Sequence, residues 1–144
     1  MKQSITTLKS QLPKDIWSED INIIAPHLKE WREIYNGNTP IMLTPRTTDE
    51  VIKCVNACRQ NAFKIVPQGG NTGLVGAGVL GEPGGVILSL SRMNAISSID
   101  VSGGSISVEA GVILEQLHKS LEGTGLMFPM HLGSEGSAQI GGLI

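Results

Sequence analysis

The 144 residues of this chain are 40% hydrophobic, 17% charged and only 3% aromatic, a composition typical of one globular domain rather than of a disordered chain. The 11 basic and 13 acidic residues leave a net charge of −2 and form no basic stretch, which argues against nucleic-acid binding. No apolar run reaches the ~20 residues that span a bilayer, and the first residues lack the apolar segment of a secretory signal. We therefore expect a cytoplasmic protein.

The first residues predict short helices interrupted by prolines, and we treat 1–35 as an N-terminal helical segment. Ser18 is the expected N-cap of one of these helices, because acidic residues follow it in the first turn. Trp17 and Trp31 are expected to pack this segment against the rest of the fold.

A parallel βαβ unit is predicted next along the chain. A strand centred on 41–43 is followed by a helix over 46–62 and then by the strand "FKIVP", with short connections between them. Thr47 and Glu50 can form a capping box at the start of the helix, where each side chain accepts from the other residue's backbone N–H. Apolar residues at helical spacing predict the buried face of this helix: Val51, Val55, Cys58 and Ala62.

The two cysteines, Cys54 and Cys58, lie on this same helix. A disulfide framework or a zinc site would need further ligands, so we expect two buried thiols and no metal site. We also find no pairing of a nucleophile with a base, and we name no catalytic residue.

The second half of the chain predicts short strands and one more helix. "GGVILSLS" is expected to be a strand, and "AISSID" and "SISVEA" are expected to form a hairpin around "VSGG". In the helix that follows, Glu115 and Lys119 can pair, and Gly123 or Gly125 can end the helix. Three leucines are expected to face the core: Leu114, Leu117 and Leu121.

Glycine is concentrated after residue 68, and the stretch "VPQGGNTGLVG" leaves the strand "FKIVP" at its carboxyl end, where ligands of α/β sheets collect. Asn71 and Thr72 add side-chain donors to this loop. Three glycines could adopt positive φ and turn successive backbone amides inward as an anion nest: Gly69, Gly70 and Gly73.

Two other interpretations of the glycine loop were weighed. The nucleotide-binding patterns do not fit, because a P-loop needs Gly-Lys-Ser/Thr and the dinucleotide fingerprint needs a helix directly after its glycines. A flexible linker or a set of tight turns remains the alternative, although apolar residues are interleaved here in a way that is unusual for linkers: Leu74, Val75 and Val79.

Four motifs in order resemble one family. "VPQGGNTGLVG", "VILSLSRMNAISSID", "SVEAG" and "FPMHLGSEGSAQIGG" are similar to the N-terminal part of FAD-linked 2-hydroxyacid dehydrogenases of the D-2-hydroxyglutarate and D-lactate dehydrogenase type. The resemblance implies an α+β fold: a truncated, two-lobed FAD-binding domain of the vanillyl-alcohol oxidase type over 36–144. Within it, the parallel βαβ unit would be followed by an antiparallel hairpin lobe.

The resemblance also implies which residues contact the cofactor. The loop after the first strand would surround the pyrophosphate, the "RMN" motif would lie toward the adenosine half, and the last glycine-rich stretch would approach from the second lobe. In several relatives a histidine at the position of Asn71 bonds to the flavin, so FAD is expected to be noncovalent here. The implied contacts are Pro67, Gln68, Gly69, Gly70, Asn71, Thr72, Gly73, Leu74, Gly78, Met93, Asn94, Pro129, Gly136, Ser137, Ile140 and Gly141.

Two positions depart from the family pattern. Leu143 stands where an asparagine usually follows "IGG", and His131 stands where an apolar or acidic residue is common. His131 could face the flavin or could be a loop histidine bonded to backbone, whereas His118 is expected to be a half-exposed helix residue.

The resemblance implies the FAD-binding portion of an enzyme that oxidises a D-2-hydroxy acid by hydride transfer to FAD, with a small 2-hydroxy acid as the substrate of the full-length relative. The substrate domain with its metal-binding and catalytic histidines is expected to be missing. The alternative is a catalytically inactive fragment that folds and forms a homodimer through its unfinished face.

Overall fold

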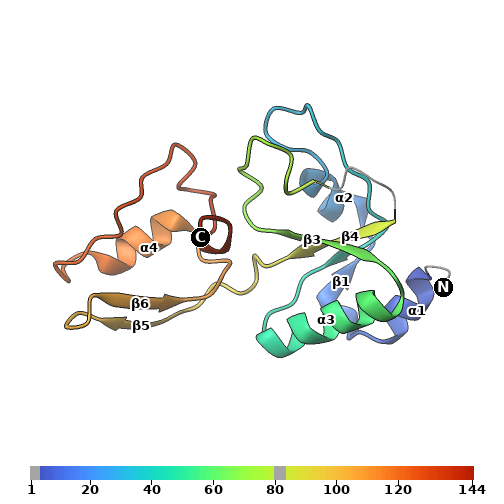
Figure 1. Ribbon diagram of the computed structural model, residues 1–144, viewed down its shortest axis with the longest axis horizontal. Helices are drawn as coiled ribbons and strands as arrows, with labels where there is room; N and C mark the ends of the chain where they lie inside the picture. The colour runs from blue at the N-terminus through green and yellow to red at the C-terminus, as the bar shows by residue number, and fades with distance from the viewer. Residues whose placement is uncertain (1–3, 80–83) are drawn as a thin grey trace.

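A computed structural model describes residues 4–79 and 84–144, and Figure 1 shows that they form two lobes. The sheet lobe comprises the described residues up to 89, and the hairpin lobe comprises residues 96–144. No helix in the described residues is long and apolar enough to cross a membrane.

The sheet lobe is built on four strands: β1 (Trp17–Ser18), β2 (Met42–Leu43), β3 (Lys64–Gln68) and β4 (Gly85–Ser89). Their order in the sheet is β1-β2-β4-β3. β2 and β3 both run parallel to β4, while β1 pairs antiparallel with β2. The predicted parallel βαβ unit is therefore present, with β4 inserted between its two strands.

β4 is buried along its whole length because both faces of the sheet are covered. Successive side chains of a strand point to opposite faces, so Val86 and Leu88 join one core cluster, while Ile87 joins the other. The helices α1 (Ile5–Ser10) and α3 (Thr48–Gln60) contribute to the first cluster.

The opposite face of the sheet is covered by α2 (Ile21–Ile24) and the short 3-10 helix η2 (Ala25–His27). Ile24 packs there against Met42 and Ile87. Fully burying an Ile or Met side chain contributes about 1.5–3 kcal/mol, so this smaller cluster is enough to hold α2 against the sheet.

The start of α3 differs in one bond from the predicted capping box. Thr47 Oγ1 accepts from the Glu50 N–H at 3.2 Å, as expected. Glu50 Oε2, however, accepts at 2.6 Å from the Arg46 N–H, one residue before the cap. The return bond of the box is thus displaced by one residue, because Glu50 accepts from the Arg46 N–H instead of the Thr47 N–H.

The predicted buried face of α3 is partly wrong. Val55 is 40% exposed, and Ala62 lies beyond the end of the helix with a φ of 57°. The buried residues are Cys54, Ala57 and Cys58, so the core-facing stripe is rotated relative to the expected one. Both cysteines are free and buried, as predicted, and burial raises the pKa of Cys54 to about 12 and that of Cys58 to about 11.

Two predictions for the N-terminal residues, the Ser18 cap and the packing of Trp31, are wrong. Asp20, rather than Ser18, caps α2: its carboxylate accepts from the Asn22 N–H at 2.9 Å, while Ser18 Oγ accepts from the Asp20 N–H at 3.1 Å. The 3-10 helix η1 (Lys14–Ile16) leads into β1, where Trp17 packs against the core as expected. Trp31 does not pack, because it is 80% exposed.

The hairpin lobe agrees closely with its prediction. β5 (Ile96–Asp100) and β6 (Ser105–Val108) are antiparallel, and they are followed by α4 (Leu114–Leu121) and the 3-10 helix η3 (Ile140–Gly142). The three predicted leucines are buried, and Leu114 and Leu117 belong to a separate core. Glu115 and Lys119 pair at 3.1 Å, and Gly123 ends α4 with a φ of 76°.

Candidate functional site

The glycine loop leaves the sheet at the carboxyl end of β3 and is tied at both of its ends by the last residue of that strand. Gln68 is buried, and its Nε2 donates to the His27 carbonyl at 3.0 Å and to the Gly78 carbonyl at 2.8 Å. Gln68 Oε1 is also hydrogen-bonded to His27 Nδ1. A single buried amide therefore fixes where the loop begins and where it returns.

The backbone of the loop differs from the predicted one. The three glycines expected at positive φ do not have it; Asn71 and Gly76 do, with φ of 53° and 75°. Asn tolerates this region better than most residues, and Asn71 Nδ2 donates to the Lys29 carbonyl at 2.5 Å. Within the described residues, the backbone N–H groups of 69–73 donate no hydrogen bond to another protein group. They are the free donors that an anion would need.

Two of these glycines allow the lobes to touch. A Cβ at Gly70 would come within 1.8 Å of the Ser137 carbonyl oxygen, and one at Gly69 would lie 3.3 Å from the Gln139 side chain. Gly73 has nothing within 4 Å of the corresponding point. At Gly70, therefore, a side chain is excluded by the hairpin lobe rather than by the need for an unusual φ.

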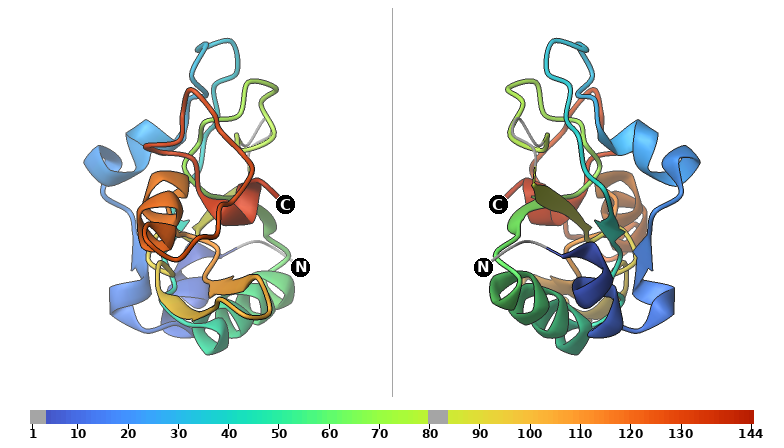
Figure 2. Two further views of the ribbon diagram at one scale, coloured as in Figure 1. Left: turned by 90° about the vertical axis from the view of Figure 1, so that its left-hand side faces the viewer. Right: turned by 90° about the vertical axis from the view of Figure 1, so that its right-hand side faces the viewer.

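A second loop, residues 29–36, lies beside the glycine loop, and Figure 2 shows both projecting from the same end of the molecule. The Arg32 guanidinium donates to the Leu74 carbonyl. A Cβ at Gly76 would come within 2.7 Å of the Tyr35 ring, so this glycine is needed for the contact as well as for its positive φ. Gly76 therefore lets the two loops pack closely.

The loop 29–36 is organised by the buried carboxylate of Glu30. It accepts from the backbone N–H groups of Arg32 at 2.7 Å, Ile34 at 2.7 Å and Tyr35 at 3.3 Å. Burial works against the charge, but the three N–H donors and the Arg32 guanidinium outweigh it and lower the pKa of Glu30 below its ordinary value. The carboxylate thus holds the loop in place beside Asn71 and Leu74.

The hairpin lobe supplies the opposite wall from its last glycine-rich stretch. Backbone carbonyls of this stretch cap α4, because the Leu114 N–H donates to Ala138 O at 2.9 Å and the Glu115 N–H to Glu135 O at 3.0 Å. No side chain caps this helix. The Gly141 N–H donates to Ala110 O at 2.8 Å, and a Cβ at Gly141 would come within 2.7 Å of the Ala110 Cβ. The wall is therefore fixed by backbone bonds.

A cavity of about 200 Å³ lies where the two lobes meet. Gln139 closes it from the hairpin lobe, and the Gln139 Oε1 atom is buried with no hydrogen-bond partner among the described residues. None of the described side chains that line it is charged. The lining residues are Pro67, Gln68, Gly69, Gly70, Asn71, Thr72, Gly73, Ala77, Gly78, Gln139, Gly142 and Leu143.

The predicted site residues divide among several places. Eight of them line this cavity, while Leu74 and Ser137 line a neighbouring cavity of about 530 Å³ that Trp31 also borders. Ile140 and Gly141 line a third cavity, of about 490 Å³, in the hairpin lobe. Four line none of these three: Met93, Asn94, Pro129 and Gly136.

Sequence reasoning missed Gln139, although it named residues on both sides of it. A polar side chain within "SAQIGG" gives no sign of which way it faces, and the only signal was its position in a motif already assigned to the site. A buried polar atom without a partner calls for an explanation, and a donor on a bound ligand would supply one.

The chemistry of this cavity suits a phosphate-containing group held without salt bridges. Residues 69–73, whose N–H groups are free, line one wall, and an Asn, a Thr and a Gln side chain add neutral donors and acceptors. Glycine keeps side chains from covering these amides. The volume is below the ~300–1,000 Å³ of typical small-molecule sites, so the cavity can hold only part of a dinucleotide.

Comparison with known proteins agrees with this chemistry. Residues 39–144 match a family described as the FAD binding domain. Over 115 residues the chain is 43% identical to a Schizosaccharomyces pombe protein provisionally named as a mitochondrial D-lactate dehydrogenase, covering 78% of this chain and 21% of that protein. It is 42% identical over 115 residues to the mitochondrial D-2-hydroxyglutarate dehydrogenase of Arabidopsis thaliana, covering 78% of this chain and 20% of that protein.

The fold is also known from solved structures. An alkyldihydroxyacetonephosphate synthase superimposes on this chain with a TM-score of 0.83 at 21% identity, covering 96% of this chain and 30% of that one. A solved structure of p-cresol methylhydroxylase shares the fold of this chain as well. The fold is therefore of the predicted vanillyl-alcohol oxidase type. The chain spans about a fifth of the length of the curated relatives above. By the match over 39–144 and by its fold, this chain belongs to the family of FAD-binding domains.

Proposed function

We propose that this chain is the FAD-binding portion of an oxidoreductase that oxidises a D-2-hydroxy acid. The observation that carries the proposal is the neutral cavity between the lobes, walled by glycines on one side and by Gln139 on the other. The substrate class rests on the names of the curated relatives, which are dehydrogenases of D-lactate and D-2-hydroxyglutarate.

In this proposal the backbone N–H groups of 69–73 bind the pyrophosphate, and Thr72 and Gln139 add side-chain contacts to the same ligand. Bound FAD would supply the hydride acceptor, and the protein would orient it and exclude water from the cavity. Among the sixteen predicted contacts, Met93, Asn94, Pro129 and Gly136 are proposed to meet the parts of the cofactor that extend beyond this cavity.

The test is a calorimetric titration of the purified chain with FAD, ADP and AMP. If the free amides bind a pyrophosphate, ADP should keep much of the affinity that FAD shows, whereas AMP should lose it. Equal binding of ADP and AMP, or no binding of FAD, would contradict the proposal.

A matched pair of glycine variants locates the binding. Gly70→Ala places a methyl group against the Ser137 carbonyl, where only 1.8 Å is available, and should abolish FAD binding by separating the lobes. Gly133→Ala meets nothing within 4 Å, needs no positive φ and lies outside the cavity of about 200 Å³, so it should bind FAD as the parent chain does. Circular dichroism of both variants separates a local effect from unfolding.

The domain boundaries and the location of the protein are proposals as well. We place the FAD-binding domain at 36–144 and the helical segment at 1–35, which limited proteolysis can test. The cytoplasmic location stays a prediction, and both relatives above are named as mitochondrial proteins.

A second candidate, self-association, is favoured by the cavity of about 490 Å³ in the hairpin lobe. It is lined largely by apolar side chains, among them Ile106, Leu117, Phe128 and Ile144. We propose that a second copy of the chain covers this face, since large apolar patches seldom stay open on soluble monomers. Light scattering should then give a dimer for the parent chain and a monomer for Ile144→Asp.

A further inference from the structure

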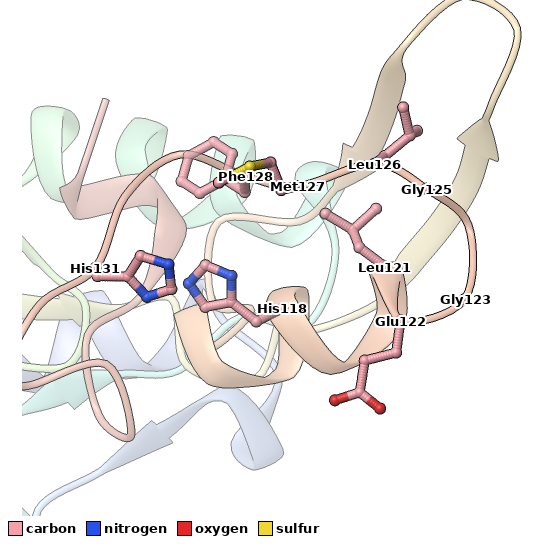
Figure 3. A pocket seen from close by; sticks show the side chains of 9 residues that line it. All are labelled: His118, Leu121, Glu122, Gly123, Gly125, Leu126, Met127, Phe128 and His131. Carbon is pink, nitrogen blue, oxygen red and sulfur yellow. The ribbon is translucent and has the colours of Figure 1, made fainter.

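Three side chains with metal-ligating atoms meet in the hairpin lobe, away from the cavity between the lobes. His118 comes from α4, and His131 and Glu135 come from the stretch that follows this helix. One ligand atom from each lies within 4.8 Å of the other two. Figure 3 shows the two imidazole rings side by side at the edge of a pocket of about 340 Å³.

The geometry points to a binding site for a divalent transition metal of the zinc type at His118, His131 and Glu135. Two imidazoles and one carboxylate are a donor set that suits Zn²⁺, with a fourth position left for water. Neighbouring ligand atoms around a tetrahedral zinc lie about 3.3–3.6 Å apart, given Zn–N and Zn–O bonds of ~2.0–2.2 Å. Glu135 Oε2 lies 3.4 Å from His131 Nδ1 and 3.9 Å from His118 Nε2, close to that spacing.

Binding requires one side chain to turn. The two rings are stacked with their centroids 4.7 Å apart and their planes at 5°, so their in-plane lone pairs run side by side instead of converging. The His131 side chain is 70% exposed on a loop and can rotate between staggered rotamers, whereas the His118 side chain is only 21% exposed. Rotation of His131 toward Glu135 brings the lone pairs together around one point.

Binding also changes one hydrogen bond. His118 Nε2 lies 3.0 Å from the Met130 carbonyl, so in that bond it carries the proton. As a metal ligand, Nε2 must be free of the proton, which then sits on Nδ1. The electrostatics favour a cation, because the described residues that line the pocket include Glu122 but no Lys or Arg.

A metal at this point would join α4 to the stretch that forms one wall of the cavity between the lobes. Glu135 already accepts the Glu115 N–H through its backbone carbonyl, and two residues later Ser137 meets Gly70. The metal therefore adds a link between the helix and this wall, so it should raise the melting temperature. This inference does not depend on the proposed function, because neither FAD nor substrate takes part in it.

The experiment is a calorimetric titration of the EDTA-treated, dialysed chain with ZnCl₂. We expect one ion per chain and a higher melting temperature with the metal. His131→Ala and Glu135→Gln should each lower the affinity at least about tenfold, since even residues that only support metal ligands are worth ~10–100-fold. His131 is exposed, so its replacement should leave the fold intact by circular dichroism.

Glu115→Gln is the matched control, because Glu115 lies on the same helix and pairs with Lys119 instead of the cluster. The affinity of Glu115→Gln for Zn²⁺ should equal that of the parent chain. Replacing Zn²⁺ by Co²⁺ should give the visible absorption of a four-coordinate ion, and His131→Ala should remove it. Unchanged affinity in both cluster variants, or no binding by the parent chain, would overturn the inference.

Discussion

Asn71 is the residue on which we expect the mode of cofactor attachment to depend. Its backbone has positive φ, and its side-chain amide is already engaged with the Lys29 carbonyl at 2.5 Å. A carboxamide lacks the nucleophilic lone pair of an imidazole, so Asn71 cannot form the bond to flavin that the sequence resemblance implies for a histidine at this position.

We therefore predict that FAD bound to this chain is released by acid. After precipitation in trichloroacetic acid, all of the flavin should be in the supernatant, as measured by its fluorescence. A yellow pellet after washing would show covalent flavin. Free FAD mixed with an unrelated precipitated protein serves as the control.

Glu30 gives the clearest dependence of stability on pH. Its pKa is lowered in the folded chain, so the folded state favours the carboxylate more strongly than the unfolded state does. The stabilisation is fully present above the ordinary pKa of 4.5 and is lost as the pH falls through the lowered, folded value. Glu30→Gln removes this stabilisation at every pH above the lowered pKa of Glu30.

The prediction is that Glu30→Gln melts below the parent chain at neutral pH and that the two curves converge in acid. Melting followed by circular dichroism from about pH 7 to about pH 3 measures this. Glu33→Gln is the control, because Glu33 is in the same loop but exposed, in a 3.7 Å surface pair with Lys29. If Glu30→Gln melts like Glu33→Gln throughout, the buried carboxylate does not stabilise the loop.

At the scale of elements, the contribution of the Thr47 cap to stability can be measured by comparing Thr47 with its neighbour Thr48. Thr47 Oγ1 accepts the Glu50 N–H, and such caps typically contribute about 1 kcal/mol. Thr47→Ala should lower the free energy of unfolding by about that amount. Thr48→Ala, one residue into the helix and without a cap bond, should change it by much less. Equal losses in urea denaturation of the two variants would show that the cap contributes nothing.

The sequence predicted the elements that rely on local signals. The helix starting after Thr47 and the hairpin around "VSGG" follow from capping chemistry and from period-two alternation, which act within a few residues. The predictions that failed depend on tertiary contacts. Trp31 is exposed because its loop is organised by hydrogen bonds to Glu30 and not by an apolar neighbour. The buried face of α3 differs from the predicted one because Cys54, and not Val55, packs in the core.

The candidate site was likewise predicted only where local sequence signals suffice. The order of strand and glycines in "FKIVPQGGNT" placed the loop correctly at the end of β3. It could not reveal why Gly70 is a glycine, because the carbonyl it makes room for belongs to Ser137, in the other lobe. The same holds for Gln139, whose unpaired oxygen becomes significant only when the lobes meet.

On the scale of the whole molecule, two close backbone contacts set the lobes around the cavity. Gly70 lies against the Ser137 carbonyl, and a Cβ at Gly111 would come within 2.2 Å of the Leu90 carbonyl oxygen. The Gly111 N–H also donates to Met93 O at 2.7 Å, so the connection between the lobes is bonded as well as tightly packed. Glycine at these two positions therefore determines how closely the cavity walls approach.

Among the residues that the structure describes, none that lines the cavity between the lobes or its neighbour could take a proton from a substrate. A general base must lie within ~2.6–3.2 Å of the proton that it removes. The described lining of the cavity of about 200 Å³ contains no carboxylate, imidazole or amine. The described lining of the neighbouring cavity of about 530 Å³ consists of Trp31, Thr72, Leu74, Gly133, Ser134 and Ser137. Binding and turnover should therefore separate in this chain, which spans about a fifth of the length of its curated relatives.

We predict that the chain binds FAD without oxidising D-2-hydroxy acids. The assay uses D-lactate and D-2-hydroxyglutarate with excess FAD and a dye acceptor, on the same sample whose FAD binding has been measured by titration. A full-length dehydrogenase in the same buffer is the positive control. Dye reduction should stay at the level of free FAD, because the described walls can orient the cofactor but cannot accept the hydroxyl proton of the substrate. Turnover above ~1 s⁻¹, within the range of ordinary enzymes, would mean that this chain contains a base outside the two cavities and would contradict the prediction.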